Sequence, residues 1–145
     1  MTEFALPSWR LLLHLVWATW WGGIFFYAIV VVPVATDAIG SVEQGFITQQ
    51  VSLFHNRLSI ALLFGLSIEA IRIRSLLLGI LTATLALNVV LLIVWHTRLT
   101  NSMNFTEHAV PKTFYASHAV YLWMFAIEWI HGVAIACFLF RSNEP

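Results

Sequence analysis

Two ionisable residues, Glu128 and His131, stand in the middle of an apolar run near the end of this 145-residue chain. The run is long enough to cross a hydrocarbon core of about 30 Å as a helix. An ionisable side chain at that depth costs at least about 2.5 kcal/mol, so it normally has a partner inside a bundle or faces a cavity. The Glu-x-x-His spacing puts both groups on one helix side, as in helical metal sites. It predicts a proton-carrying or ligand-binding pair, or else a hydrogen-bonded pair that only fixes helix register.

Six histidines carry most of the remaining chemistry. His55, His96 and His118 come from three different apolar runs at similar depths, with Asp37 and His108 in the adjoining polar segments. Imidazole and carboxylate ligands suit copper. For a copper ion we therefore expect the first three histidines as ligands, with Asp37 or His108 completing the set.

Haem b is the second cofactor that these residues suit, because a pair of histidines can hold its iron. In that case two of the three histidines would be axial ligands, and Arg57 and Arg98 would stand near the propionates. A further polar group is expected deeper in the bundle, where Glu128 could also meet residues of other helices. It consists of His14, Glu69, Asn88, Glu128 and His131.

The elements that must position these side chains are membrane-spanning helices. The composition is 60% hydrophobic and 10% charged, whereas an ordinary soluble surface needs about 25% charged residues. Apolar runs predict an all-α fold, one domain over residues 1–145, built as an integral-membrane antiparallel four-helix bundle. Only a tight turn near Arg74 and Ser75 fits between the second and third spans. The predicted spans are 11–34, 51–72, 75–97 and 118–141. A polar connection is expected over 35–50, either as a loop or continuing as an amphipathic helix at the interface.

The helical period predicts which faces turn inward, because residues advance about 100° each. In the second span one line carries His55, Ser59, Leu62, Leu66 and Glu69. Four spans place both chain ends on one side, and that side holds the larger share of arginines, which favours the cytoplasm. These arginines are Arg10, Arg72, Arg74 and Arg141.

Charge and cysteine content limit the partners. Seven basic residues balance seven acidic ones, so nothing indicates nucleic acid. The single Cys137 excludes an internal disulfide or a cysteine metal cage. We expect a multi-pass protein of the bacterial inner or cell membrane, surrounded by lipid bilayer, that binds copper or haem b and serves copper handling or electron transfer with a redox partner. The alternative is a non-catalytic accessory subunit of a larger membrane complex.

The run LHLVWATWWGGIFFYAIVVVP, the segment FHNRLSIALL, the ending WHTRL and the Phe114-x-x-x-His118 opening together resemble the copper-resistance-D-like (CopD) membrane proteins and their four-helix relatives of unknown function. This resemblance implies a four-helix membrane bundle and copper handling. The first helix, with His14, is also similar to that of the HemJ-type protoporphyrinogen oxidases, which are associated with haem. That family uses an intramembrane lysine, and no predicted span of this chain contains one.

Overall fold

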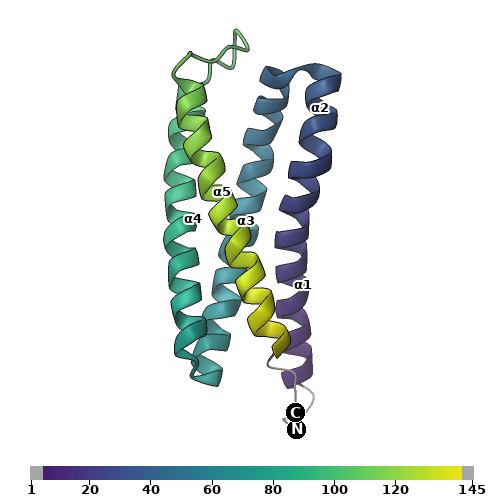
Figure 1. The fold of residues 1–145 in the computed structure, drawn as a ribbon, viewed down its shortest axis with the longest axis vertical. Helices are drawn as coiled ribbons and strands as arrows, with labels where there is room; N and C mark the ends of the chain where they lie inside the picture. Colours follow the sequence, from purple (N-terminus) through teal and green to yellow (C-terminus); the bar gives the residue numbers. More distant parts are fainter. Residues whose placement is uncertain (1–4, 142–145) are drawn as a thin grey trace.

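The computed structural model describes residues 5–141, and in this part of the chain every helix or strand element is a helix (Figure 1). The predicted all-α class is therefore confirmed. Four helical segments are long and apolar enough to cross a membrane, and they coincide with the four predicted apolar runs, although each extends further at one end or both. Their bounds are Trp9–Ile39, Ser41–Ile73, Leu76–Ser102 and Phe114–Phe140.

The first segment contains a wide turn. It runs through α1 (Ala5–Phe26), the π-helix η1 (Tyr27–Val31) and α2 (Val32–Ile39). Pro33 has no N–H to donate to the preceding turn, and its ring crowds that turn. A π-turn relieves this crowding: the Val32 N–H bonds back five residues to the Tyr27 carbonyl. The Tyr27 hydroxyl lies 2.9 Å from the Thr48 hydroxyl and so ties the π-helix to α3.

The polar segment 35–50 is almost entirely helical, which agrees with the helical alternative for this connection. Only Gly40 interrupts the helices there, with a φ of 90° that favours glycine, and α3 (Ser41–Ile73) starts at once. Polar residues in this stretch are compatible with a helix because their side chains bond to one another at helical spacing. Gln44 Nε2, for example, donates to the Thr48 hydroxyl one turn later.

Two connections join the remaining helices. Arg74, in the left-handed region at φ 52°, ends α3, and the Ser75 hydroxyl caps α4 (Leu76–Ser102) by accepting from the Leu78 N–H at 3.3 Å. The tight turn predicted there is confirmed. Residues 103–113 form the other connection, before α5 (Phe114–Arg141). Its His108 lies 2.9 Å from a carboxylate oxygen of Glu43 at the start of α3.

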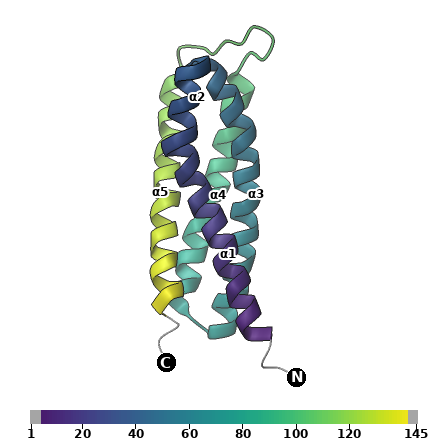
Figure 2. The same cartoon turned by 90° about the vertical axis from the view of Figure 1, so that its right-hand side faces the viewer.

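The long helices lie side by side (Figures 1 and 2). The start of α1, the turn between α3 and α4, and the end of α5 lie at one end of the molecule, which we call the turn end. The junction of α2 with α3 and the connection 103–113 lie at the opposite end, which we call the loop end.

Apolar side chains pack the interior near the turn end and also cover the outside. The larger buried cluster draws on all four segments and consists of Leu13, Trp20, Leu62, Leu66, Leu78, Leu85, Val89, Ile135 and Leu139. On the outside, large apolar side chains such as Phe64, Ile71, Leu76 and Trp123 are at least two-thirds exposed. A water-soluble surface would not carry so many, whereas hydrocarbon around these helices would solvate them.

Candidate functional site

A chain of hydrogen bonds crosses the middle of the bundle and ends at Glu128. Nε2 of His55 on α3 lies 3.1 Å from Oε2 of Glu128 on α5. The Ser59 hydroxyl donates to the other carboxylate oxygen at 2.8 Å, and Trp20 Nε1 on α1 donates to the Ser59 oxygen at 2.8 Å. Three helices therefore meet at one carboxylate.

This network is closed off from the outside. Glu128 is 1% exposed and His55 is 8% exposed, while Ser59 and Trp20 are buried as deeply as the carboxylate. The His55 ring stacks on the Trp20 ring, with centroids 5.9 Å apart and planes 16° apart, and the Phe125 ring covers it at 5.3 Å. The imidazole is held in one orientation, so its Nε2 stays directed at the carboxylate.

Helical spacing accounts for the α3 part of this site. His55 and Ser59 are one turn apart, so both project from one face. The five residues predicted on the inward line of this helix are all buried: His55, Ser59, Leu62, Leu66 and Glu69.

Close packing of α1 against α5 determines where Glu128 lies along the bundle. Trp17 Nε1 donates to the Gly132 carbonyl at 3.0 Å, and Trp21 Nε1 donates to the Trp129 carbonyl at 3.2 Å. A Cβ atom at Gly132 would overlap the Trp21 ring. Asn88 Nδ2 of α4 donates to the Met124 carbonyl at 3.1 Å on the other side of α5. These bonds fix the position of α5, and with it Glu128.

His131, the expected partner of Glu128, bonds elsewhere. Its Nδ1 lies 2.8 Å from the Ile127 carbonyl of its own helix, and its Nε2 lies 3.1 Å from the Thr84 hydroxyl of α4. A three-residue spacing brings two side chains to one side of a helix, but it does not direct them to the same neighbour. Glu128 turns toward α3 and His131 toward α4.

The other residues of the expected deeper group also lie apart. Nδ1 of His14 is 2.6 Å from the Arg10 carbonyl of its own helix. Glu69 is at the turn end, where Trp9 Nε1 donates to it at 3.1 Å and Arg72 Nε at 2.8 Å. Arg10 Nε is 3.7 Å from the same carboxylate. This cluster fastens the start of α1 to the end of α3.

The five residues expected to hold copper are distributed over several places. His55 belongs to the buried network, whereas His96 Nε2 donates to the Gln49 carbonyl at 3.1 Å and His118 stacks on Phe114. His108 pairs with Glu43 in the connection 103–113, and Asp37 is exposed at the end of α2. Within residues 5–141, no three histidine, cysteine, aspartate or glutamate side chains are grouped so that they could hold a metal ion.

The two arginines expected near haem propionates lie over rings of their own helices. The guanidinium carbon of Arg57 is 5.4 Å from the Phe54 ring centroid, and that of Arg98 is 5.3 Å from the Trp95 centroid. Both arginine side chains are exposed, and neither lines the cavity described next.

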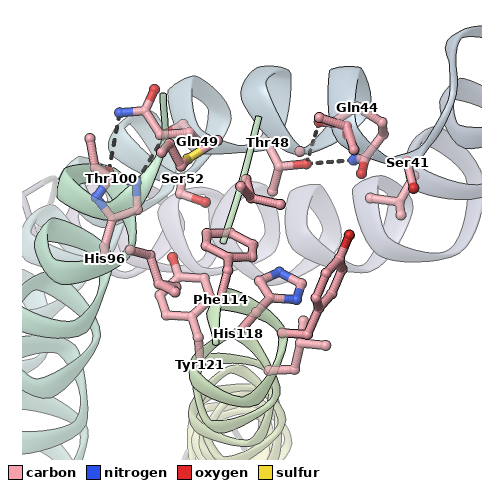
Figure 3. A pocket seen from close by; sticks show the side chains of 18 residues that line it. Ser41, Gln44, Thr48, Gln49, Ser52, His96, Thr100, Phe114, His118 and Tyr121 are labelled. Carbon is pink, nitrogen blue, oxygen red and sulfur yellow. Dashed lines mark hydrogen bonds between the residues drawn. The ribbon is translucent and has the colours of Figure 1, made fainter. Parts of the chain in front are cut away.

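A cavity of about 240 Å³ lies near the loop end between α2, α3, α4, α5 and the connection 103–113 (Figure 3). Two of the expected copper ligands, His96 and His118, line it, and so does Tyr121. The Tyr121 side chain is 4% exposed. Its ring lies edge-on to Phe125, with centroids 4.9 Å apart, and Phe125 in turn contacts His55. The cavity is therefore separated from the buried network by one layer of rings.

Sequence reasoning did not assign Trp20 or Tyr121 to the site. Trp20 is one of seven tryptophans, most of which are expected at the membrane interface or in helix packing. No spacing singles it out as the donor to Ser59. Tyr121 does fall on the line of α5 that carries His118 and Glu128, and this shared line is the signal that could have identified it.

Comparisons of the chain with protein-family models, with curated proteins and with solved structures give no match.

Proposed function

We propose that the chain is a multi-pass membrane protein, an antiparallel four-helix bundle with both chain ends on the cytoplasmic side of a bacterial inner or cell membrane. The length and apolar character of the four helical segments support the membrane assignment. The positive-inside rule supports the orientation, because Arg10, Arg72 and Arg74 lie toward the turn end. Arg98 and Lys112 lie toward the loop end, which would face the exterior.

We further propose that His55 and Glu128 together take up and release a proton inside this bundle, as one step of electron transfer or copper handling. The observation that carries the proposal is the 3.1 Å contact between Nε2 of His55 and Oε2 of Glu128 at the middle of the helices. Either charge alone would be costly at that depth. When a carboxylate and an imidazole in contact share one proton, the pair carries no net charge; when that proton is released, the carboxylate still accepts from the Ser59 hydroxyl.

Tyr121 lies between this pair and the loop end, because its ring packs edge-on against Phe125, whose ring covers His55. Beyond Tyr121, the cavity is lined by His96 and Gln49. Between this pair and the Glu69 cluster at the turn end, the interior side chains Leu62, Leu66 and Ile135 are apolar and completely buried. The proton would therefore exchange with the loop-end side of the membrane.

A proton titration of the purified protein tests this function. As the pH is lowered through the range in which histidine titrates, wild-type protein should bind about one proton more than Glu128→Gln, which keeps the shape of the side chain. Glu107→Gln makes the same chemical change at an exposed carboxylate and should leave proton uptake unchanged. If Glu128→Gln folds normally and binds as many protons as wild type, Glu128 only sets the helix register.

Labelling with a membrane-impermeant maleimide tests the direction of access. In a Cys137→Ala background, a cysteine in place of Thr48, which lines the cavity, should react from the loop-end side. A cysteine in place of the buried Leu66 should react from neither side. Reaction of the second cysteine from the turn-end side would contradict one-sided access.

Copper and haem b remain proposals with weaker support than the proton pair. His96 and His118 share the cavity, and the His96 N–H bond to the Gln49 carbonyl is of the kind that orients a metal-binding imidazole. The cavity is smaller than the range of about 300–1,000 Å³ that is usual for larger ligands, which argues against haem. Metal analysis and one absorption spectrum of the purified protein test both: absence of stoichiometric copper and of a Soret band would exclude them.

A further inference from the structure

The cavity at the loop end is lined by a tyrosine, Tyr121, whose hydroxyl has no partner in hydrogen-bonding geometry among the described residues. The Tyr121 hydroxyl is completely buried, and no group within residues 5–141 closes a hydrogen bond with it, although Ser52 is near enough to act on it. Buried polar groups are nearly always bonded, and leaving one unpaired costs about 1–3 kcal/mol. Because Tyr121 lines the cavity, a ligand acceptor atom that displaces the side chains covering this hydroxyl would satisfy it.

A second polar side chain lies beside it on the same helix face. His118, three residues before Tyr121, also lines the cavity and is only partly exposed. Its ring stacks on the Phe114 ring with planes 13° apart. No hydrogen bond joins His118 to any other residue of the described chain. A flat ligand could therefore lie along these rings and meet two polar groups of α5.

The lining determines which ligands are excluded. Among the described residues, no lysine, arginine, aspartate or glutamate lines the cavity. A charged ligand would meet hydroxyl, amide and imidazole groups there but no lysine, arginine or carboxylate to pair with, and burying an unpaired charge is costly. The cavity also lies among helices that are apolar enough to cross a membrane. A neutral molecule that dissolves in lipid fits both conditions.

We propose that this cavity binds a neutral, lipid-soluble molecule with a flat ring that carries a carbonyl group. The Tyr121 O–H donates to the carbonyl oxygen, and the ring lies against Phe114 and His118. The volume of about 240 Å³ suits one ring with short substituents and leaves a longer tail outside the cavity. This site depends on the cavity and on Tyr121. It does not depend on proton binding by Glu128, and its test is separate.

Binding of decyl-ubiquinone to the protein in nanodiscs tests the proposal. Tyr121→Phe keeps the ring and removes the hydroxyl, so it should weaken binding about three- to tenfold. Tyr115→Phe is the matched control, because Tyr115 lines the same cavity but is 59% exposed. It should leave the affinity unchanged. Decylbenzene, which has no carbonyl, should bind wild type and Tyr121→Phe equally.

Stability without ligand provides a second measurement that does not depend on the probe. Removing an unpaired buried hydroxyl should leave Tyr121→Phe as stable as wild type or more stable. Gly45→Leu should abolish binding while the protein stays folded, because nothing lies within 4 Å of a Cβ atom at Gly45 and the added side chain would fill the cavity. Gly79→Leu, where a Cβ atom would also meet nothing within 4 Å, is the control outside the cavity.

Three results would overturn the proposal. The first is equal affinity of wild type, Tyr121→Phe and Gly45→Leu for decyl-ubiquinone, which would indicate partition into the lipid alone. The second is a loss of stability in ligand-free Tyr121→Phe with unchanged binding, which would show that the hydroxyl already has a structural partner. The third is binding of copper(I) that requires His96 and His118 and excludes the quinone, which would assign the cavity to a metal.

Discussion

Removing the contact between His55 and Glu128 should reveal whether the pair is charged. Glu128→Leu leaves the His55 N–H and the Ser59 hydroxyl without their acceptor, so it should destabilise the protein by about 3 kcal/mol or more. His55→Phe keeps a ring against Trp20 and removes only the polar contact. In a double-mutant cycle, a hydrogen bond between charged groups contributes about 1.5–3 kcal/mol. Neutral bonds between membrane helices average about 0.6 kcal/mol.

Unfolding of wild type, Glu128→Leu, His55→Phe and the double variant by sodium dodecyl sulfate in mixed micelles measures this coupling energy. The matched control is the neutral pair Tyr27 and Thr48, whose hydroxyl oxygens are 2.9 Å apart between the first helical segment and α3. The cycle of Tyr27→Phe with Thr48→Val should give the smaller value. A His55–Glu128 coupling no larger than that of the control would refute a charged pair that shares a proton.

Two further variants test the packing that places the site. Gly132→Ala should destabilise the protein by about 1–3 kcal/mol and weaken the contact between α1 and α5, because the added Cβ atom would overlap the Trp21 ring. The control Gly79→Ala should be neutral or slightly stabilising. Equal effects of the two substitutions in detergent unfolding would count against this packing. Glu69→Gln removes the charged partner of the partly exposed Arg72 and should cost about 1.5 kcal/mol, with faster hydrogen exchange at the start of α1. Unchanged exchange there would show that the turn-end cluster does not hold α1.

The sequence was sufficient to predict the helices and the inward face of α3. Apolar runs of about 20 residues leave few structures other than helices, because each backbone group must be bonded within its own segment in lipid. The 100° advance per residue then relates His55, Ser59 and Glu69 correctly, since it depends on one helix alone. The bounds were less accurate, because polar residues near Gly40 continue the helices without a signal in hydropathy.

The partner of Glu128 could not be predicted in this way. Glu128 contacts His55 because of the way α5 is rotated about its axis and shifted along α3. Hydrogen bonds such as the one from Asn88 to the Met124 carbonyl determine this position. Periodicity within one helix contains no information on that relation. The expected grouping of His55, His96 and His118 failed to appear as a three-residue metal site for the same reason: similar depth along separate helices does not make side chains converge.

Infrared difference spectroscopy of the pH change tests the proton pair most directly, because a protonated carboxyl group has its own C=O stretching band. If Glu128 and His55 share a proton, acidification through the range in which histidine titrates should change one carboxyl signal. That signal should be absent in Glu128→Gln and displaced in His55→Phe, and it should persist in Glu107→Gln. A wild-type spectrum with no carboxyl signal that depends on Glu128 would contradict the proposal.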